Sequence, residues 1–174
     1  MTAKSIVESR MANLNDYLII KEINRGEFGC VYLIKSKINE QILAAKVSRS
    51  YSQNSILSMI HELSILFQIQ GPTIIPFYGF SPKDFKDGSN LTILMKYQEN
   101  GSLDHFIELE TKSQSPPEYD NTAKQIILCG IAHGMMSLHS HDVIHTDLKP
   151  ANVLLDSNLF PCITDFGMSH TESE

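Results

Sequence analysis

The spacing of apolar residues changes along this chain, and that change constrains the fold more than any other feature of the sequence. Up to residue 97, short runs of β-branched, aromatic and aliphatic residues are separated by turn residues, which is typical of strands. Strands are expected at residues 17–23, 30–34, 41–47, 74–80 and 91–97. Between the third and the fourth, residues 55–69 carry apolar side chains at steps of three and four, which predicts one amphipathic helix.

From residue 98 onward the pattern is mainly helical. A turn at residues 100–102 is expected to lead into a short helix, and residues 120–140 predict a long, buried one. The long helix carries apolar residues on one face and small residues that permit close packing: Ile127, Ile131, Met135 and Leu138, with Gly130, Ala132 and Gly134. We therefore expect an α+β fold. A polar lead-in at 1–16 precedes a five-stranded antiparallel half at 17–97 and a mainly helical half at 98–174.

Charge and composition exclude several classes of protein. The net charge of −6, from 14 Lys and Arg against 20 Asp and Glu, argues against a nucleic-acid binder that works by bulk electrostatics. The first sixteen residues lack the apolar core of a secretory signal, and no apolar run is long enough to span a bilayer. The scattered cysteines Cys30, Cys129 and Cys162 favour a reducing compartment. A cytoplasmic protein without a nucleic-acid or membrane partner is expected.

Three oxygen-bearing residues near the end of the chain predict a catalytic and metal-binding site. Asp147 and Asn152 flank a proline-containing loop, and Asp165 follows thirteen residues after Asn152. Carboxylate and amide oxygens are the hard ligands that Mg²⁺ prefers. Asp147 is placed to orient and deprotonate an attacking hydroxyl group. Lys149, two residues later, is placed to neutralise charge on a phosphoryl group.

Two upstream features are consistent with a phosphate-binding site. Gly26 and Gly29 lie in a turn between two predicted strands, where glycine lets the backbone approach a phosphate closely. A Rossmann motif would need a helix after the turn, and no Gly-Lys-Ser/Thr sequence of a Walker loop occurs. Lys46 ends the apolar segment Leu43-Ala44-Ala45, and Glu62 lies on the predicted helix. Held by Glu62, Lys46 would be a positioned cation for polyphosphate oxygens.

In this order, the residues resemble the signature of eukaryotic-type protein kinases, over the span from Ile23 to Gly167. The resemblance implies a kinase-like fold, with an N-lobe at 17–97 and a partial C-lobe at 98–174, and the cofactors ATP and Mg²⁺. By resemblance, Asp147, Lys149, Lys46 and Glu62 are catalytic and Asn152 and Asp165 bind the metal. The residues implied to contact the nucleotide are Ile23, Gly26, Gly29, Val31, Ala44, Lys46, Lys96, Gln98 and Leu154.

The resemblance also implies a substrate class. Lys149-Pro150 after Asp147 is similar to the serine/threonine-specific kinases, so the expected partner is a protein with a Ser or Thr hydroxyl group. The residues from Tyr97 to Leu103 are similar to the tyrosine-kinase-like group of these enzymes. Thr146 stands where the family has an arginine that pairs with a phosphorylated activation loop. Activation by loop phosphorylation is therefore not expected.

Seven residues follow Gly167, so most of the activation loop and the later C-lobe helices of the family are expected to be missing. The apolar face of the 120–140 helix would then be exposed, which predicts either a fragment prone to aggregation or one that a partner completes at the C-lobe. Two alternatives to an active protein kinase remain. The first is a catalytically impaired kinase-like module that binds ATP or kinase partners. The second is a small-molecule kinase of the aminoglycoside-phosphotransferase kind, which Phe166-Gly167 after Asp165 and Lys149-Pro150 argue against.

Overall fold

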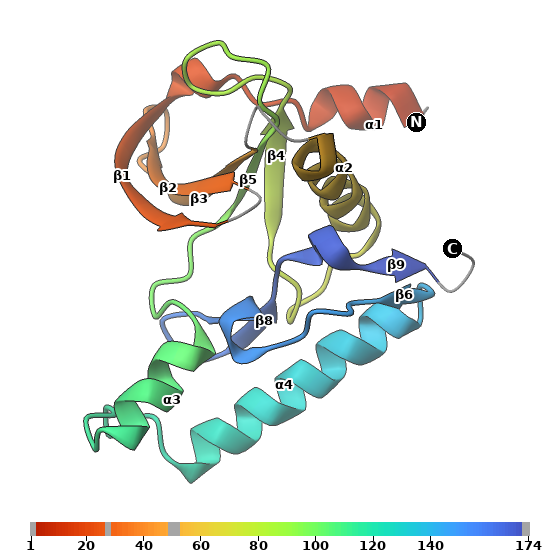
Figure 1. The fold of residues 1–174 in the computed structure, drawn as a ribbon. Helices are drawn as coiled ribbons and strands as arrows, with labels where there is room; N and C mark the ends of the chain where they lie inside the picture. The colour runs from red at the N-terminus through yellow and green to blue at the C-terminus, as the bar shows by residue number, and fades with distance from the viewer. Residues whose placement is uncertain (1–2, 27–28, 49–52, 172–174) are drawn as a thin grey trace. The chain divides into compact units, whose positions relative to one another are not determined.

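The computed structural model describes residues 3–26, 29–48 and 53–171 (Figure 1). These residues fall into two compact units. The N-terminal unit comprises Met1–Ser64 and Pro76–Tyr97, and the C-terminal unit comprises Ile65–Ile75 and Gln98–Glu174. Residues 65–75 therefore belong to the C-terminal unit although the segments on both sides of them belong to the N-terminal unit.

The N-terminal unit is built on one antiparallel sheet with the strand order β1-β2-β3-β5-β4. Its strands are β1 (Tyr17–Arg25), β2 (Gly29–Ser36), β3 (Ile42–Ser48), β4 (Phe77–Ser81) and β5 (Thr92–Lys96). Helix α2 (Gln53–Gln68) follows β3. The α+β fold with a five-stranded antiparallel sheet and one helix, as predicted from the spacing of apolar residues, is confirmed.

Alternating side chains form the core of this unit. One cluster joins Leu14, Ile34, Leu43, Ala45 and Leu94, all of which are buried. Because successive side chains of a strand point to opposite faces of the sheet, Leu43 and Ala45 of β3 enter this core and the residue between them points to the other face.

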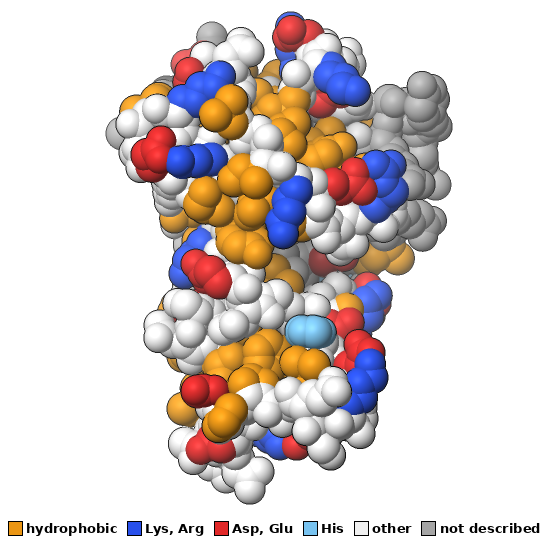
Figure 2. Space-filling model, turned by 90° about the vertical axis from the view of Figure 1, so that its left-hand side faces the viewer, with side chains coloured by type: hydrophobic (Ala, Val, Ile, Leu, Met, Phe, Trp, Pro, Cys, Tyr) orange, Lys and Arg blue, Asp and Glu red, His pale blue; other side chains and the backbone are white. Residues whose placement is uncertain are grey.

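Strand β1 lies at an edge of the sheet and remains largely exposed. Its register with β2 shifts twice, once between Ile19 and Lys21 and once between Glu22 and Asn24. Four of its apolar residues are exposed, namely Leu18, Ile19, Ile20 and Ile23, and Figure 2 shows hydrophobic side chains gathered on this side. Bulges of this kind twist an edge strand and hinder further strand pairing.

The opposite edge of the sheet is covered by the N-terminal segment, for which the sequence predicts only a polar lead-in. After α1 (Ala3–Ser9), the chain runs alongside β4 before it forms η1 (Leu14–Asp16). The amide of Ala12 donates to the carbonyl of Phe80 at 2.7 Å, and the amide of Phe80 donates to that of Arg10 at 2.9 Å. A Cβ atom on Gly79 would lie 2.7 Å from the Arg10 carbonyl oxygen, so glycine permits this close approach.

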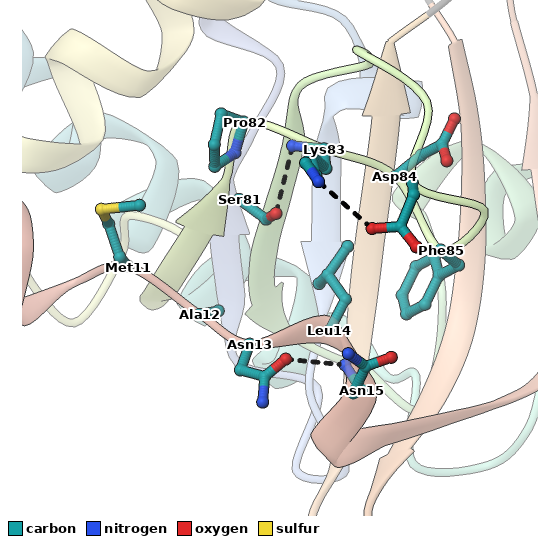
Figure 3. Close-up of a pocket in the computed structure, with 11 residues that line it drawn as sticks. Met11, Ala12, Asn13, Leu14, Asn15, Ser81, Pro82, Lys83, Asp84 and Phe85 are labelled. Atoms are coloured by element: carbon teal, nitrogen blue, oxygen red, sulfur yellow. Dashed lines mark hydrogen bonds and ion pairs between the residues drawn. The ribbon is translucent and has the colours of Figure 1, made fainter.

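A pocket of about 340 Å³ lies where this N-terminal segment meets the loop after β4 (Figure 3). Its wall consists of residues 11–15 from the segment, with residues 81–85 and Asp87 from the loop. The Asp84 carboxylate organises that loop, since it accepts hydrogen bonds from the amides of Lys86 and Gly88 and from the side chain of Asn90. The two segments therefore form one folded surface on the N-terminal unit.

The prediction of a continuous strand at residues 74–80 is wrong. Strand β4 begins at Phe77, while Ile74 and Ile75 belong to the C-terminal unit and pair with Ile163. The amide of Ile75 donates to the carbonyl of Ile163 at 2.9 Å. Pro76 separates the two pairings, and its lack of an N–H group prevents it from donating to a ladder. One apolar run thus serves two different units.

The C-terminal unit combines two helices with short strands and turns. Its elements are α3 (Leu103–Thr111), α4 (Asn121–His139), β6 (Val143–Ile144), η2 (Pro150–Asn152), β7 (Val153–Leu155), β8 (Pro161–Ile163), η3 (Phe166–Met168) and β9 (His170–Thr171). Strand β6 pairs with β9, and β7 pairs with β8, both antiparallel. These two small ladders position the loops that connect them.

Helix α4 is buried along one face only, which corrects the prediction of a buried helix. Gly130 and Gly134 lie on the packed face, where added Cβ atoms would come within 2.4 Å of Pro161 Cγ and 2.7 Å of Ile163 Cδ1. The predicted close packing at these two glycines is therefore present. Ile126, Leu128 and Met136 are exposed, and so is Ala132.

Neither a membrane span nor a clustered metal centre is found in the described part of the chain. Within those residues, no helix is both long and apolar enough to cross a bilayer. They also contain no group of three or more His, Cys, Asp or Glu side chains arranged to hold a metal ion. A metal site here would have to use fewer carboxylates and draw on amide oxygens as well.

Candidate active site

The N-terminal unit contains a short, buried ion pair between Lys46 of β3 and Glu62 of α2. The distance from Lys46 Nζ to Glu62 Oε2 is 2.5 Å. The Glu62 side chain is 1% exposed and that of Lys46 is 13% exposed. An ionised glutamate buried this deeply carries a large desolvation penalty, which the adjacent ammonium group of Lys46 offsets. The pair holds the ammonium group in place within strand β3, where Lys46 follows Leu43, Ala44 and Ala45.

The glycine-containing turn closes the β1–β2 hairpin. The amide of Gly26 donates to the carbonyl of Gly29 at 2.9 Å, and residues 27–28 between them lie outside the described chain. A Cβ atom on Gly29 would lie 2.1 Å from the carbonyl oxygen of Val47, so only glycine fits there. Asn24 pairs with Val31 in the β1–β2 ladder.

The other residues implied to contact a nucleotide belong to both units. In the N-terminal unit, Val31 pairs with Lys46 and Ala44 pairs with Met95, while Ile23 is exposed on β1. Lys96 is the last residue of β5, and its amide donates to the Pro76 carbonyl.

In the C-terminal unit, Gln98 is buried and donates from Nε2 to Cys162 Sγ at 3.0 Å. Leu154 lies opposite Cys162 in the β7–β8 ladder. Gln98 and Leu154 are thus linked through one buried cysteine.

The C-terminal unit brings Asp147, Lys149 and Asn152 together in one loop. The Asp147 carboxylate accepts a hydrogen bond from Lys149 Nζ at 2.8 Å and another from Asn152 Nδ2 at 3.1 Å. The same Asn152 amide group also donates to the Asp147 carbonyl at 2.8 Å. Pro150 begins the η2 turn, whose fixed backbone angle favours a helical start and brings Asn152 back towards Asp147. The loop is held together by its own polar side chains.

These contacts favour the ionised form of Asp147. The hydrogen bond from Lys149 is the largest cause that lowers the pKa of Asp147; the Asn152 bond acts in the same direction and partial desolvation opposes them. In return, the Asp147 carboxylate raises the pKa of Lys149, and Asp165 adds to this effect. Asp147 is therefore a carboxylate at neutral pH, as a group that accepts a proton from a hydroxyl must be.

Asp165 sits on a tightly organised turn next to this loop. Its backbone adopts a left-handed conformation with φ 67° and ψ 63°, and the 3-10 turn η3 follows at once. The amide of Thr164 donates to the Asn152 carbonyl at 3.0 Å, which fixes the two segments together. His145 is fully buried, donates from Nε2 to the Thr164 carbonyl at 3.1 Å, and packs its ring 5.3 Å from that of Phe166. The backbone around Asp165 is thus held from two sides.

Asn152 and Asp165 fit the donor set of a magnesium site. Asn152 uses its amide nitrogen on Asp147, so its side-chain oxygen is the atom left to act as a ligand. Amide and carboxylate oxygens are hard ligands, and Mg²⁺ is commonly bound by only one or two protein carboxylates with the remaining positions filled by water and phosphate.

Sequence reasoning missed one residue of this loop as a structural participant. The sequence marks Thr146 only as the residue that stands where the family has an arginine, yet its hydroxyl group donates to the Met168 carbonyl at 2.6 Å. No local pattern of residues predicts a bond between positions so far apart in the sequence. Only the β6–β9 pairing, which was itself too short to predict, brings them together.

Comparison with known proteins identifies the class to which this fold and these residues belong. The family model of the protein kinase domain matches residues 17–174. The chain therefore belongs to the protein kinase family. The resemblance drawn from the motif residues is confirmed, and the chain is classed with kinase enzymes by that resemblance.

Several curated kinases are similar to the chain. It is 32% identical over 160 residues to cAMP-dependent protein kinase type 3 of Saccharomyces cerevisiae, covering 90% of this chain and 38% of that protein. It is 30% identical over 159 residues to Cold-responsive protein kinase 1 of Arabidopsis thaliana, covering 89% and 39%. It is also 30% identical over 161 residues to the Probable serine/threonine protein kinase IRE of Arabidopsis thaliana, covering 90% and 13%. The chain spans less than half of the length of each of these relatives.

Proposed function

We propose that this chain carries the active site of a protein serine/threonine kinase that transfers the γ-phosphoryl group of Mg·ATP to a protein hydroxyl group. The arrangement of Asp147 supports this function best. Its carboxylate is kept ionised by Lys149 and oriented by Asn152, while its side chain remains 39% exposed. A carboxylate that is both fixed and accessible suits an acceptor for the proton of an incoming hydroxyl group.

Each residue has a distinct part in the proposed reaction. Asp147 aligns the substrate hydroxyl group and accepts its proton as the oxygen forms a bond to the γ-phosphorus. The bond from that phosphorus to the bridging oxygen breaks, and its electron pair leaves with ADP. Lys149 stabilises negative charge on the phosphoryl group as it moves. Bound Mg·ATP supplies the phosphoryl group and the divalent charge that offsets the charge of the phosphates.

The remaining residues bind and position the nucleotide in this proposal. Lys46, fixed by Glu62, binds phosphate oxygens, and Asn152 and Asp165 hold Mg²⁺ through their side-chain oxygens. Ile23, Gly26, Gly29, Val31, Ala44, Lys96, Gln98 and Leu154 form the nucleotide contacts. A protein with a Ser or Thr hydroxyl group is the substrate. We also predict that the chain belongs to the tyrosine-kinase-like group. A further prediction is a partner that covers the exposed residues Leu128 and Met136 of α4.

Phosphate transfer from Mg·ATP to a generic basic protein, detected by mass spectrometry, tests the proposal. The Asp147→Asn variant should lose about 100-fold to 10,000-fold in rate, because the amide cannot accept the proton. Asp142→Asn is the matched control, since Asp142 is exposed and its positive φ of 58° is tolerated by asparagine. Equal transfer by native chain and Asp147→Asn would refute the assigned role of Asp147.

A thermal shift separates this function from that of a binding module. If Mg·ATP binds the folded chain at 100 times its dissociation constant, it stabilises the fold by about 2.7 kcal/mol. Stabilisation by Mg·ATP without any transfer would favour the catalytically impaired module. No stabilisation at millimolar Mg·ATP would count against both functions.

A further inference from the structure

The residue before the proposed catalytic base sits in a strained turn. The amide of Asp147 donates to the carbonyl of His145 at 2.8 Å, which closes a three-residue γ-turn centred on Thr146. Thr146 has a φ of 59°. A γ-turn with positive φ at its centre is rare and strained, and a β-branched residue seldom adopts that conformation. Such a conformation persists only where the surrounding structure enforces it.

The side chain of Thr146 makes a hydrogen bond that ties this turn to a neighbouring segment. Strands β6 and β9 pair Val143 with Thr171 and Ile144 with His170. Continuing the same register past the end of the ladder places Thr146 opposite Met168. There the Thr146 hydroxyl group donates to the Met168 carbonyl at 2.6 Å. A side-chain bond therefore extends the pairing where the backbone turns away towards Asp147.

The bond connects two parts of the site. Thr146 directly precedes Asp147, and Met168 ends the η3 turn that begins one residue after Asp165. The amide of Ser169 donates to the Phe166 carbonyl at 3.0 Å, which closes that turn. A shift of the Thr146 hydroxyl group would thus loosen the turn that carries Asp147 and its connection to the segment after Asp165.

We propose that Thr146 is a positioning residue, whose hydroxyl group holds the strained γ-turn so that the Asp147 carboxylate meets the substrate hydroxyl group. This inference rests on the proposed kinase function. Thr146 itself touches neither nucleotide nor substrate in this scheme. Its loss should therefore lower kcat and leave the KM for ATP nearly unchanged. Because misplacement of a reacting group by about 1 Å can cost about 100-fold in rate, we expect at least a tenfold fall.

Two substitutions separate the hydroxyl group from the shape of the side chain. Thr146→Val keeps the β-branched shape and removes the donor, whereas Thr146→Ser keeps the donor and removes the branch. We expect Thr146→Val to lose kcat and Thr146→Ser to retain at least half of the native value. Thr111→Val is the matched control, because the Thr111 hydroxyl group makes a similar 2.7 Å bond to the Glu108 carbonyl at the exposed end of α3. Thr111→Val should leave kcat unchanged.

A second measurement is independent of catalysis. Hydrogen exchange at the Asp147 amide, followed by NMR, reports whether the γ-turn bond opens. Exchange at Asp147 should become at least tenfold faster in Thr146→Val but not in Thr146→Ser or Thr111→Val. If Thr146→Val fails to fold, Thr146→Ala replaces it in both measurements. Native exchange and native kcat in the variant without the hydroxyl group would overturn the proposal.

The two arms also distinguish this inference from the proposed function. If the native chain transfers no phosphate, the kinase function fails, and the exchange measurement still decides whether Thr146 holds the turn. If the native chain is active and Thr146→Val lowers kcat without faster exchange at Asp147, the positioning role is refuted.

Discussion

Removing either partner of the Lys46–Glu62 pair should destabilise the chain far more than removing both. At the observed 2.5 Å, two unit charges attract with about 7 kcal/mol at an effective dielectric constant of about 20. Burial of each ion costs several kcal/mol, so the net contribution of the intact pair is small. Glu62→Leu leaves a charged Lys46 beside a buried apolar side chain. We expect a loss of about 3–5 kcal/mol in the free energy of unfolding.

The assay is urea denaturation of four chains: native, Lys46→Met, Glu62→Leu and the double variant. The double variant should lie within about 1 kcal/mol of the native chain, because no uncompensated buried charge remains. Lys112 and Glu108 provide a matched pair with the same 2.5 Å separation, but their side chains are 55% and 61% exposed. The corresponding substitutions there should have little effect, since water screens an exposed pair.

The reasoning would be refuted if the two single substitutions were additive in the double variant. Additivity would mean that Lys46 and Glu62 contribute to stability independently, despite their contact. If the substitutions in the exposed Lys112–Glu108 pair also caused a large loss in the free energy of unfolding, burial would not be what determines the size of the effect. Phosphate transfer, measured on the same variants, should be lost in the double variant even though it is stable. Stability and the proposed role of Lys46 are thereby separated.

Three further perturbations test the fold. Gly29→Ala should cost at least about 3 kcal/mol in urea denaturation, because its Cβ would lie 2.1 Å from the Val47 carbonyl oxygen. Gly130→Ala should cost about 1–3 kcal/mol, since its Cβ would meet Pro161 at 2.4 Å. Asp84→Asn should lower Tm at neutral pH. Burial raises the pKa of Asp84, but three hydrogen bonds from its own loop together lower it. The ionised Asp84 carboxylate stabilises the fold fully above the usual aspartate pKa of about 3.9. This stabilisation is lost as pH falls through the lowered pKa of Asp84, and there the native chain and Asp84→Asn should have the same Tm.

Much of the N-terminal unit could be predicted because its elements depend on local sequence. The strands lie in short apolar runs separated by turn residues, and α2 lies where apolar residues recur at steps of three and four. The apolar run at residues 74–80 shows where this logic ends. Its residues are equally suited to any buried strand, so the pattern could not tell that Ile74 and Ile75 pair with Ile163. Partner choice depends on tertiary contacts that no short window contains.

The candidate site divides in the same way. Asp147, Lys149 and Asn152 contact one another within six residues, and their spacing alone suggested a shared role. The contact between Lys46 and Glu62 joins a strand to a helix and follows from the order of motifs rather than from spacing. The pairing of residues 10–12 with the edge strand β4 could not be predicted from the sequence. These residues pair through their backbone, and their side chains show no strand pattern.

The backbone conformation of Thr146 could not be predicted from residue propensities, because β-branched residues disfavour the positive φ that Thr146 adopts. Among the described non-glycine residues with positive φ are Glu40, Asp87, Ser113 and Asp142, and Thr146 is the only β-branched one in that group. Aspartate tolerates this conformation, whereas threonine is disfavoured in it. A local preference is overridden where a tertiary contact outweighs it, and such conflicts concentrate at functional sites. The Thr146–Met168 bond is that contact, and its position beside Asp147 is the reason to expect that the strain serves catalysis rather than the stability of the fold.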